Sequence, residues 1–240
     1  MLFPVRTLAP VGIAGKAPSS LLSGLISYWK LEEASGTRND SHSTNHLTDN
    51  NTVTQAVGKV GNAAQFTAAN SESLSCASNA SLQCGDIDFT VVAWVYFDSI
   101  ASQNAIVSRQ GQEYLLDCSS TFSNKFVFRV YQGAGATEKT AVSNTFGAAS
   151  TGTWYFLIGQ HDAANDLAGI SVNNGALDTV ATGGALSAAT AANLRIGARD
   201  AINQRFITGR VDEVGFWKRL LTSDEKAHLY NSGNGRSYPF

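Results

Sequence analysis

Two pairs of adjacent carboxylates are the residues of this sequence best suited to acid–base chemistry: Glu32–Glu33 and Asp212–Glu213. Cleavage of a glycosidic bond needs two carboxyl groups flanking that bond, roughly 5 to 10 Å apart. Successive side chains of a strand point to opposite faces of a sheet, so neither pair supplies both groups. The sequence also lacks a Gly-x-Ser-x-Gly nucleophile elbow. We therefore predict that the chain is not an enzyme.

The histidines and cysteines are further candidates for chemistry. His42 and His46 are four residues apart, a spacing that suits zinc only on a helix. They lie in a polar stretch, residues 32–51, that predicts a long loop, so we expect solvated histidines. Cys76, Cys84 and Cys118 are too few for a disulfide framework in 240 residues. We expect buried thiols; the alternative is a pairing of Cys76 with Cys84 across a hairpin.

Aromatic side chains are the candidates for binding a sugar, because their flat apolar faces can pack against a pyranose ring. The candidates are Trp94, Tyr96, Tyr131, Trp154, Tyr155 and Trp217. The strands of a sandwich also need large inward-facing side chains, so we expect most of the six in the core.

The composition indicates which elements position these residues. The chain is 43% hydrophobic and only 15% charged, below the roughly 25% typical of soluble domains. Its 22 glycines, with few Lys and Glu, favour many short strands joined by turns. A net charge of −2 argues against a nucleic-acid partner. No uninterrupted run of about 18 apolar residues occurs, so we expect no membrane insertion.

About a dozen predicted strands indicate an all-β fold, a two-sheet antiparallel β-sandwich. The strongest is Phe89–Phe97, which is apolar on both faces as in the centre of a sandwich. Residues 125–131 alternate cleanly, and residues 205–217 close the set. Asn174–Gly175 is a type I′ hairpin signal. Thr222 and Glu225 form a capping box that predicts a short C-terminal helix.

Residues 1–24 are predicted to form an extended, proline-rich N-terminal arm, and residues 25–240 the sandwich domain. Proline favours extended backbone and cannot donate to a strand ladder, so the arm is either a flexible linker or a strap that lies along a neighbour, and we expect the strap. The residues expected to dock are Leu2, Phe3, Pro4, Val5, Leu8 and Pro10. The arm therefore predicts contacts with neighbouring subunits, in a homo-oligomer or a larger assembly. Prolines and glycines interrupt its apolar residues, so we recognise no signal peptide.

Blocks at both ends and in the middle of the chain resemble one family. They are residues 25–33, 58–63, 89–95, 194–197, 206–217 and 229–233. Their order is similar to that of the laminin-G-like (concanavalin A-like) jelly-roll domains found in bacterial and phage surface proteins. The resemblance covers residues 25–240 and implies a jelly-roll sandwich. Glucan hydrolases of this fold carry Glu-x-Asp-x-x-Glu on a strand, and this sequence has no such run.

The resemblance also implies a site for Ca²⁺ where the N-terminal loop meets the last strand. The matching candidate ligands are Glu32, Asp40 and Asp212. By strand alternation, Asp212 shares a face with Val214 and Phe216, where an unpaired carboxylate is costly. Either a bound cation or hydrogen bonds from loop amides would offset that cost, and we expect one of the two.

Three functions remain open. The first combines the arm and the domain: a virion component, such as a phage decoration or tail protein, whose jelly roll faces outward to bind glycans or cell surfaces. The second is a stand-alone bacterial lectin-like adhesion protein. The third, disfavoured by the missing catalytic run, is a domain related to glycoside hydrolases. The expected location is a virion surface or the extracellular space.

Overall fold

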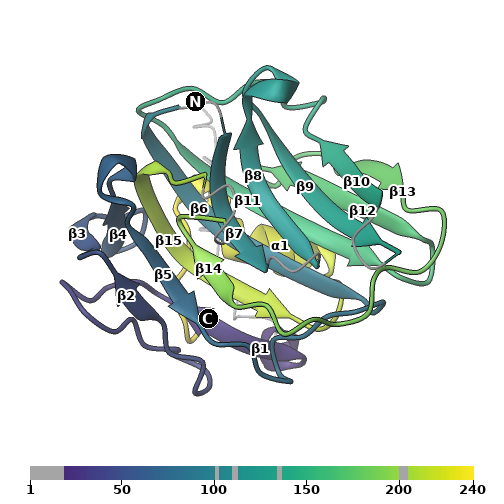
Figure 1. Ribbon diagram of the computed structural model, residues 1–240, viewed down its shortest axis with the longest axis horizontal. Coiled ribbons are helices and arrows are strands. Elements are labelled where there is room, and N and C mark those ends of the chain that lie inside the picture. Colours follow the sequence, from purple (N-terminus) through teal and green to yellow (C-terminus); the bar gives the residue numbers. More distant parts are fainter. Residues whose placement is uncertain (1–18, 101–102, 110–112, 134–136, 200–204) are drawn as a thin grey trace, which may run out of the picture.

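The protein is described by a computed structural model that covers residues 19–100, 103–109, 113–133, 137–199 and 205–240. Figure 1 shows two antiparallel sheets stacked face to face, as predicted for a jelly-roll sandwich. The arm residues Leu2, Phe3, Pro4, Val5, Leu8 and Pro10 lie outside the described residues. Their docking role therefore stays a prediction.

The strands of the two sheets are not consecutive in the chain, as is usual for a jelly roll. The larger sheet has the order β13 (Asp178–Ala181), β12 (Leu167–Val172), β11 (Trp154–Asp162), β6 (Phe89–Ser99), β15 (Thr208–Trp217), β4 (Asn62–Phe66) and β3 (Thr54–Val57), and β1 (Leu25–Trp29) also pairs with β15. The smaller sheet has the order β10 (Thr137–Val142), β9 (Lys125–Gln132), β8 (Tyr114–Ser119), β7 (Gln103–Arg109), β14 (Leu194–Ile196), β5 (Ser73–Cys76) and β2 (Thr48–Asn50).

Short 3-10 helices and one α-helix complete the secondary structure of the described residues. They are η1 (Ser19–Leu22), η2 (Ala68–Asn70), η3 (Ser120–Phe122), α1 (Ser223–Tyr230) and η4 (Asn231–Gly233). The capping box predicted for α1 is confirmed, with the Thr222 side chain accepting from the Glu225 amide and the Glu225 carboxylate accepting from the Thr222 amide. No helix within the described ranges is both long and apolar enough to cross a membrane.

The main core lies between the sheets and is rich in aromatic rings. Phe89 of the central strand β6 packs against Tyr114, Phe128 and Phe216, with ring centroids 5.4, 6.0 and 6.3 Å away. All four residues are buried. The strong apolar run predicted at Phe89–Phe97 therefore forms the centre of the sandwich.

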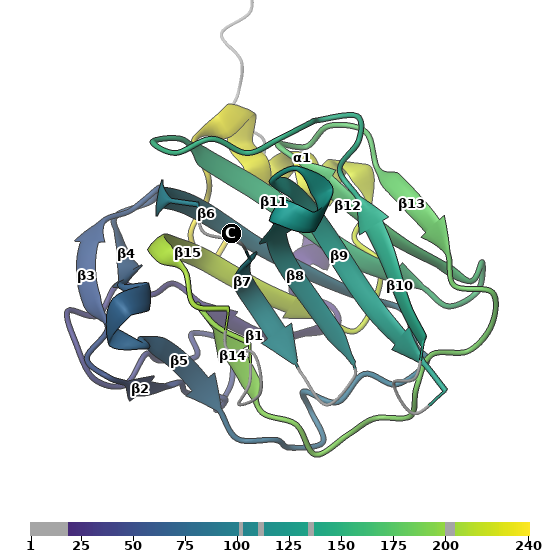
Figure 2. The same cartoon turned by 45° about the horizontal axis from the view of Figure 1, so that its top comes forward.

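A second apolar cluster covers the outer face of the larger sheet, the face turned away from the smaller sheet. Here α1 and η1 pack over Val92, Trp94 and Trp217, and Figure 2 shows α1 lying across this side of the sheet. Leu21 is 1% exposed, and its carbonyl accepts a 2.8 Å hydrogen bond from the Trp217 indole. The folded domain therefore begins before Leu25, because residues assigned to the arm already belong to this cluster.

The three cysteines are free and buried, as expected from the sequence. Burial is the main cause that raises the pKa of each thiol, to about 12 for Cys118. The alternative pairing of Cys76 with Cys84 is not formed.

Candidate functional site

Asp212 does not share a face with Val214 and Phe216, and this prediction from strand alternation is wrong. The pairing of β15 with β6 shifts register between Asp212 and Gly215, and Glu213 adopts a left-handed φ of 47°. This β-bulge inserts one extra residue and reverses the phase of the alternation. Asp212 consequently pairs with Trp94 on the outer face, whereas Val214 and Phe216 point into the main core.

Asp212 and Glu32 hold the turn between β3 and β4. The Oδ2 atom of Asp212 accepts hydrogen bonds from the amides of Lys59 and Val60, at 2.8 and 2.9 Å. The Oε2 atom of Glu32 accepts from the Asn62 amide at 2.9 Å. The two predicted ligands thus lie at one turn, where their carboxylates satisfy backbone donors.

The glycines at the ends of this turn make room for the two carboxylates. A Cβ at Gly58 would lie 2.7 Å from Oδ2 of Asp212. Gly61 has a left-handed φ of +60°, and a Cβ there would overlap the carboxylate of Glu32. The Gly58-Lys59-Val60-Gly61 segment therefore has the residue types that this close approach requires.

Asp212, Glu213 and Glu32 form a carboxylate cluster, and burial is the main cause of the raised pKa values of Asp212 and Glu213. It raises the pKa of Asp212 to about 8; the Val60 and Lys59 amides lower this pKa, and Glu213 and Glu32 raise it. The pKa of Glu213 is raised to about 7, again mainly by burial, while the Tyr28 and Ser237 hydroxyls lower it. Asp212 Oδ1 is buried without a hydrogen-bond partner among the described residues. Asp212 and Glu213 therefore bind protons more tightly than an exposed carboxylate does.

Asp40, the third predicted calcium ligand, ties down a different loop. Its carboxylate accepts four amide hydrogen bonds of 2.9 to 3.1 Å, from Tyr28, His42, Ser43 and Asn45. Its own amide donates to Nδ1 of the exposed His46 at 3.0 Å. The structure therefore does not gather Glu32, Asp40 and Asp212 into one set of donors.

The fit of these residues to calcium is correspondingly poor. Six to eight oxygen ligands around one point are typical of a Ca²⁺ site. Across the described ranges, no group of three or more His, Cys, Asp or Glu side chains is arranged to hold a metal ion. Calcium binding by the predicted trio remains a prediction for experiment.

The structure separates the six aromatic candidates into two groups. Trp94, Tyr131, Tyr155 and Trp217 are buried, whereas Tyr96 and Trp154 are half-buried. Tyr96 and Trp154 pair directly across β6 and β11, with ring centroids 5.6 Å apart and planes at 52°. Both lie on the outer face of the larger sheet, beside Trp94 and Phe156 of the second cluster.

These two rings belong to a row of side chains that crosses five strands. Successive pairing partners are Trp154 of β11, Tyr96 of β6, Arg210 of β15, Gln65 of β4 and Thr54 of β3. Directly opposed residues of antiparallel strands project to the same face, so the five side chains form one line. We call this line the cross-strand row. Strands lie about 4.8 Å apart, so the row is about 19 Å long.

Contacts within the cross-strand row fix its polar half. The Arg210 guanidinium lies 4.6 Å from the centre of the Tyr96 ring. Its Nε donates to the Gln65 side-chain oxygen at 2.9 Å, and Gln65 donates to Asp98 at 2.8 Å. The row therefore presents two rings, a guanidinium and an amide in a fixed arrangement.

Helix α1 covers Trp94, which is buried, whereas the two rings of the row are half-buried. Tyr230, the last residue of α1, stacks on Trp94 with ring centroids 5.8 Å apart and planes at 13°. The Lys59 ammonium lies 4.9 Å from the centre of the same indole. Trp94 and Tyr96 are two residues apart on one face of β6, and Trp154 packs against the second cluster, so the row begins at the edge of this cluster.

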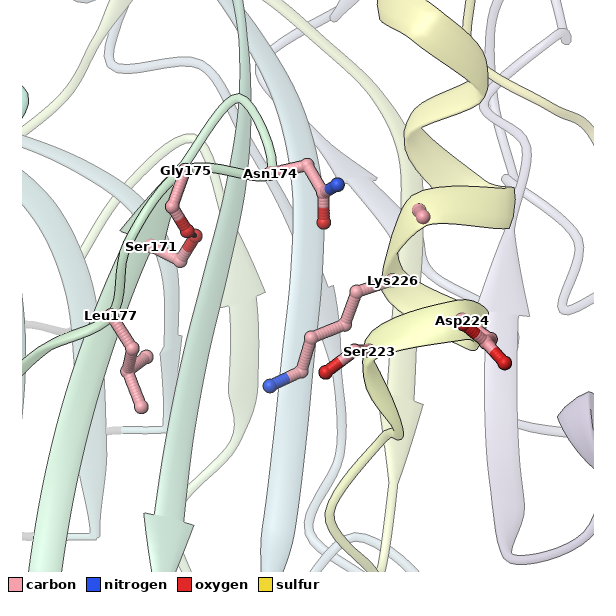
Figure 3. A pocket seen from close by; sticks show the side chains of 8 residues that line it. Ser171, Asn174, Gly175, Leu177, Ser223, Asp224 and Lys226 are labelled. Carbon is pink, nitrogen blue, oxygen red and sulfur yellow. Dashed lines mark hydrogen bonds between the residues drawn. The ribbon is translucent and has the colours of Figure 1, made fainter.

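A groove lies on the same outer face, between the β12–β13 turn and α1 (Figure 3). It has a volume of about 400 Å³. The turn is of type I′, but it is centred on Asn173 and Asn174, with φ of 54° and 55°, and the Gly175 amide donates to the Val172 carbonyl. It thus falls one residue earlier than the predicted Asn174–Gly175.

The two stacked antiparallel sheets define the class of the protein as a jelly-roll sandwich. A family model described as the concanavalin A-like lectin/glucanases superfamily, laminin-G type, matches residues 68–225. The chain belongs to this family, as its sequence blocks indicated. A comparison with curated protein sequences finds no match.

Solved structures with this fold include toxin binding domains and a domain of a glycosidase. The binding domain of Paraclostridial Mosquitocidal Protein 1 is similar with a TM-score of 0.71 and 15% identity, over 89% of this chain and 53% of that one. Domain 4 of AbnA, a GH43 extracellular arabinanase from Geobacillus stearothermophilus in complex with arabinotriose, has a TM-score of 0.59 and 15% identity, over 88% and 98%.

The ligand-binding domain of botulinum neurotoxin serotype D, in complex with N-acetylneuraminic acid, has a TM-score of 0.64 and 9% identity, over 89% of this chain and 52% of that one. The chain thus spans about half the length of the toxin domains. At these identities the likeness establishes the fold, which is shared with binding domains and with an enzyme-associated domain.

Proposed function

We propose that this chain is a glycan-binding module whose ligand stacks on Tyr96 and Trp154. The observation that carries the proposal is the cross-strand row, in which two adjacent half-buried rings lie beside Arg210 and Gln65. Ring faces offer apolar area to the C–H face of a sugar, and the polar groups can bond its hydroxyls. Two proteins of the same fold carry a sugar in their solved complexes, which supports the ligand class.

The row is also rigid, which favours binding. Tyr96 and Trp154 lie in strands that are hydrogen-bonded on both sides, and the Arg210 side chain is fixed by Gln65. A preorganised surface loses little side-chain entropy when a ligand arrives. This rigidity supports the row as the place where a saccharide is bound.

Substitution of the rings tests the proposal. Trp154→Ala and Tyr96→Ala should each weaken binding to the best ligand of a glycan array by about 2 kcal/mol, or roughly 30-fold. Phe146→Ala is the matched control, because Phe146 is 41% exposed and outside the row. A parent protein that binds no glycan at millimolar concentration would refute the function, and undiminished binding by Trp154→Ala would refute the site.

The proposed module is non-catalytic. The carboxylates of Glu32 and Asp212 accept hydrogen bonds from backbone amides, and Glu213 is buried beside Tyr28. These environments suit a structural role for the cluster. Release of reducing sugar from any array ligand during prolonged incubation would contradict this part of the proposal.

We further propose that residues 1–18 attach the module to neighbouring subunits of a larger assembly, such as a virion, so that the row faces outward. The support is the proline-rich, apolar composition of the arm. Deletion of residues 1–18 should abolish oligomerisation in light scattering yet preserve the melting temperature, because the second cluster begins only at Leu21. An unchanged oligomeric mass would refute the arm as the attachment. A stand-alone lectin-like adhesion protein is the alternative, and it predicts that unchanged mass.

A further inference from the structure

The groove beside α1 has two walls of different origin. One wall is the β12–β13 connection with Asn174 and Leu177, and the other is the first turns of α1 with Ser223 and Lys226. Figure 3 shows Asn174 and Lys226 extending from opposite sides of the opening. Its volume of about 400 Å³ falls within the range of small-molecule clefts, about 300–1,000 Å³.

Both walls are held in place by local hydrogen bonds. The Lys226 ammonium donates to the Gln160 side-chain oxygen at 2.6 Å, which fixes the helix over β11. The Ser171 hydroxyl donates to the Gly175 carbonyl at 2.8 Å and braces the turn. The groove is therefore part of the folded framework.

The chemistry of the lining suits a neutral, hydroxyl-rich ligand. Asn174 and Ser223 offer uncharged donors and acceptors, and both are exposed. Lys226 and Asp224 carry opposite charges, so the groove has no strong net field. Leu177 is 38% exposed and supplies one apolar surface. A sugar ring presents the matching combination of hydroxyls and an apolar face.

The groove lies next to the cross-strand row. The Asn173 amide donates to the Phe156 carbonyl at 2.7 Å, and the Phe156 amide donates to Oδ1 of Asn173 at 2.9 Å. Phe156 follows Trp154 by two residues on the same face of β11. A ligand stacked on Trp154 of β11 therefore lies on the strand next to β12, whose connection to β13 forms one wall of the groove.

We infer that the groove is a second saccharide subsite, and that the ligand is an oligosaccharide that spans the row and the groove. This inference rests on the proposed glycan-binding function. The ligand must be longer than one sugar ring, because a single ring can occupy the row or the groove but not both. Longer glycans should gain affinity from the second contact.

Ala227 offers a way to fill the groove without altering its framework. This residue is exposed on α1 and lines the groove, so Ala227→Trp places an indole in the opening. Ala191→Trp is the matched control, because Ala191 is also exposed but lies outside the groove. Leu177→Ala is a second variant, which removes the apolar surface instead of filling the space. Melting temperatures of all variants verify that they are folded.

The test uses a printed array of mono- to hexasaccharides built from hexoses, pentoses, amino sugars and sialic acid. Ala227→Trp and Leu177→Ala should bind long glycans at least tenfold more weakly than the parent, and mono- and disaccharides equally well. Binding equal to the parent at every length would overturn the inference while leaving the row intact. A parent that prefers monosaccharides would also overturn it. A parent that binds no spot would instead overturn the proposed function.

Discussion

Asp212→Asn should make the stability of the protein less dependent on pH. The Asp212 carboxyl is fully buried, and one of its oxygens accepts the amides of Lys59 and Val60. An asparagine has the same shape, and its side-chain oxygen can accept the same two amides. The substitution therefore removes an ionisable group while it retains the contacts of the turn.

The sign and size of the effect follow from the raised pKa. The folded pKa of Asp212 is about 8, against an ordinary value of 3.8. The folded state thus binds the proton more tightly, and this stabilisation is complete below pH 4 and is lost as pH rises through 8. At about 1.4 kcal/mol for each pH unit, the loss is at most about 6 kcal/mol. Structural relaxation around the charge reduces such costs, so we expect about 2–4 kcal/mol.

Urea unfolding at pH 5, 7 and 9, with chelator present, measures this effect. The free energy of unfolding of the parent should fall from pH 5 to pH 9. The fall in Asp212→Asn should be smaller but not absent, because Glu213, whose pKa is raised to about 7, also loses its proton. If the difference between the two proteins is the same at all three pH values, the reasoning about Asp212 is refuted.

Three further predictions concern the metal, the helix and the core. If calcium is bound, chelator should lower the melting temperature of the parent. An unchanged melting temperature would refute calcium binding. Thr222→Ala should destabilise the protein by about 1 kcal/mol in urea unfolding, because the capping box is lost; wild-type stability would show that α1 does not depend on its cap. Gly159→Ala should cost about 1–3 kcal/mol, since a Cβ there overlaps the Phe128 ring. An unaltered melting temperature for this variant would mean that the ring has room to move.

Local sequence patterns predicted most of the fold, because strand burial and helix capping depend on residues that are close together in the chain. The apolar run Phe89–Phe97 becomes the central strand β6, and the Thr222–Glu225 capping box begins α1. Strands β3 and β10 were not predicted. Their sequences, TQAV and TEKTAV, are short and partly polar, so they resemble loops until pairing with β4 and β9 makes them strands.

The site was predictable only in part, because it depends on pairing between distant segments. The sequence singled out Tyr96 and Trp154 as candidates, but only register places them beside Arg210 and Gln65. The bulge at Glu213 gives no clear signal, since a glutamate rarely adopts positive φ. It was the cause of the wrong face assigned to Asp212. The groove joins the β12–β13 connection to the first turns of α1, about 50 positions further along the chain, which no local pattern can reveal.

The segment Gly209–Asp212 is bounded by two irregularities in the pairing of β15 with β6. Register shifts between Thr208 and Gly209, and again between Asp212 and Gly215. Arg210 thus lies in a short stretch between two pairing irregularities, and this stretch is paired with β6 on one side and with β4 on the other. The register of Arg210 against Tyr96 is therefore set separately from the register of Val214 and Phe216 in the main core.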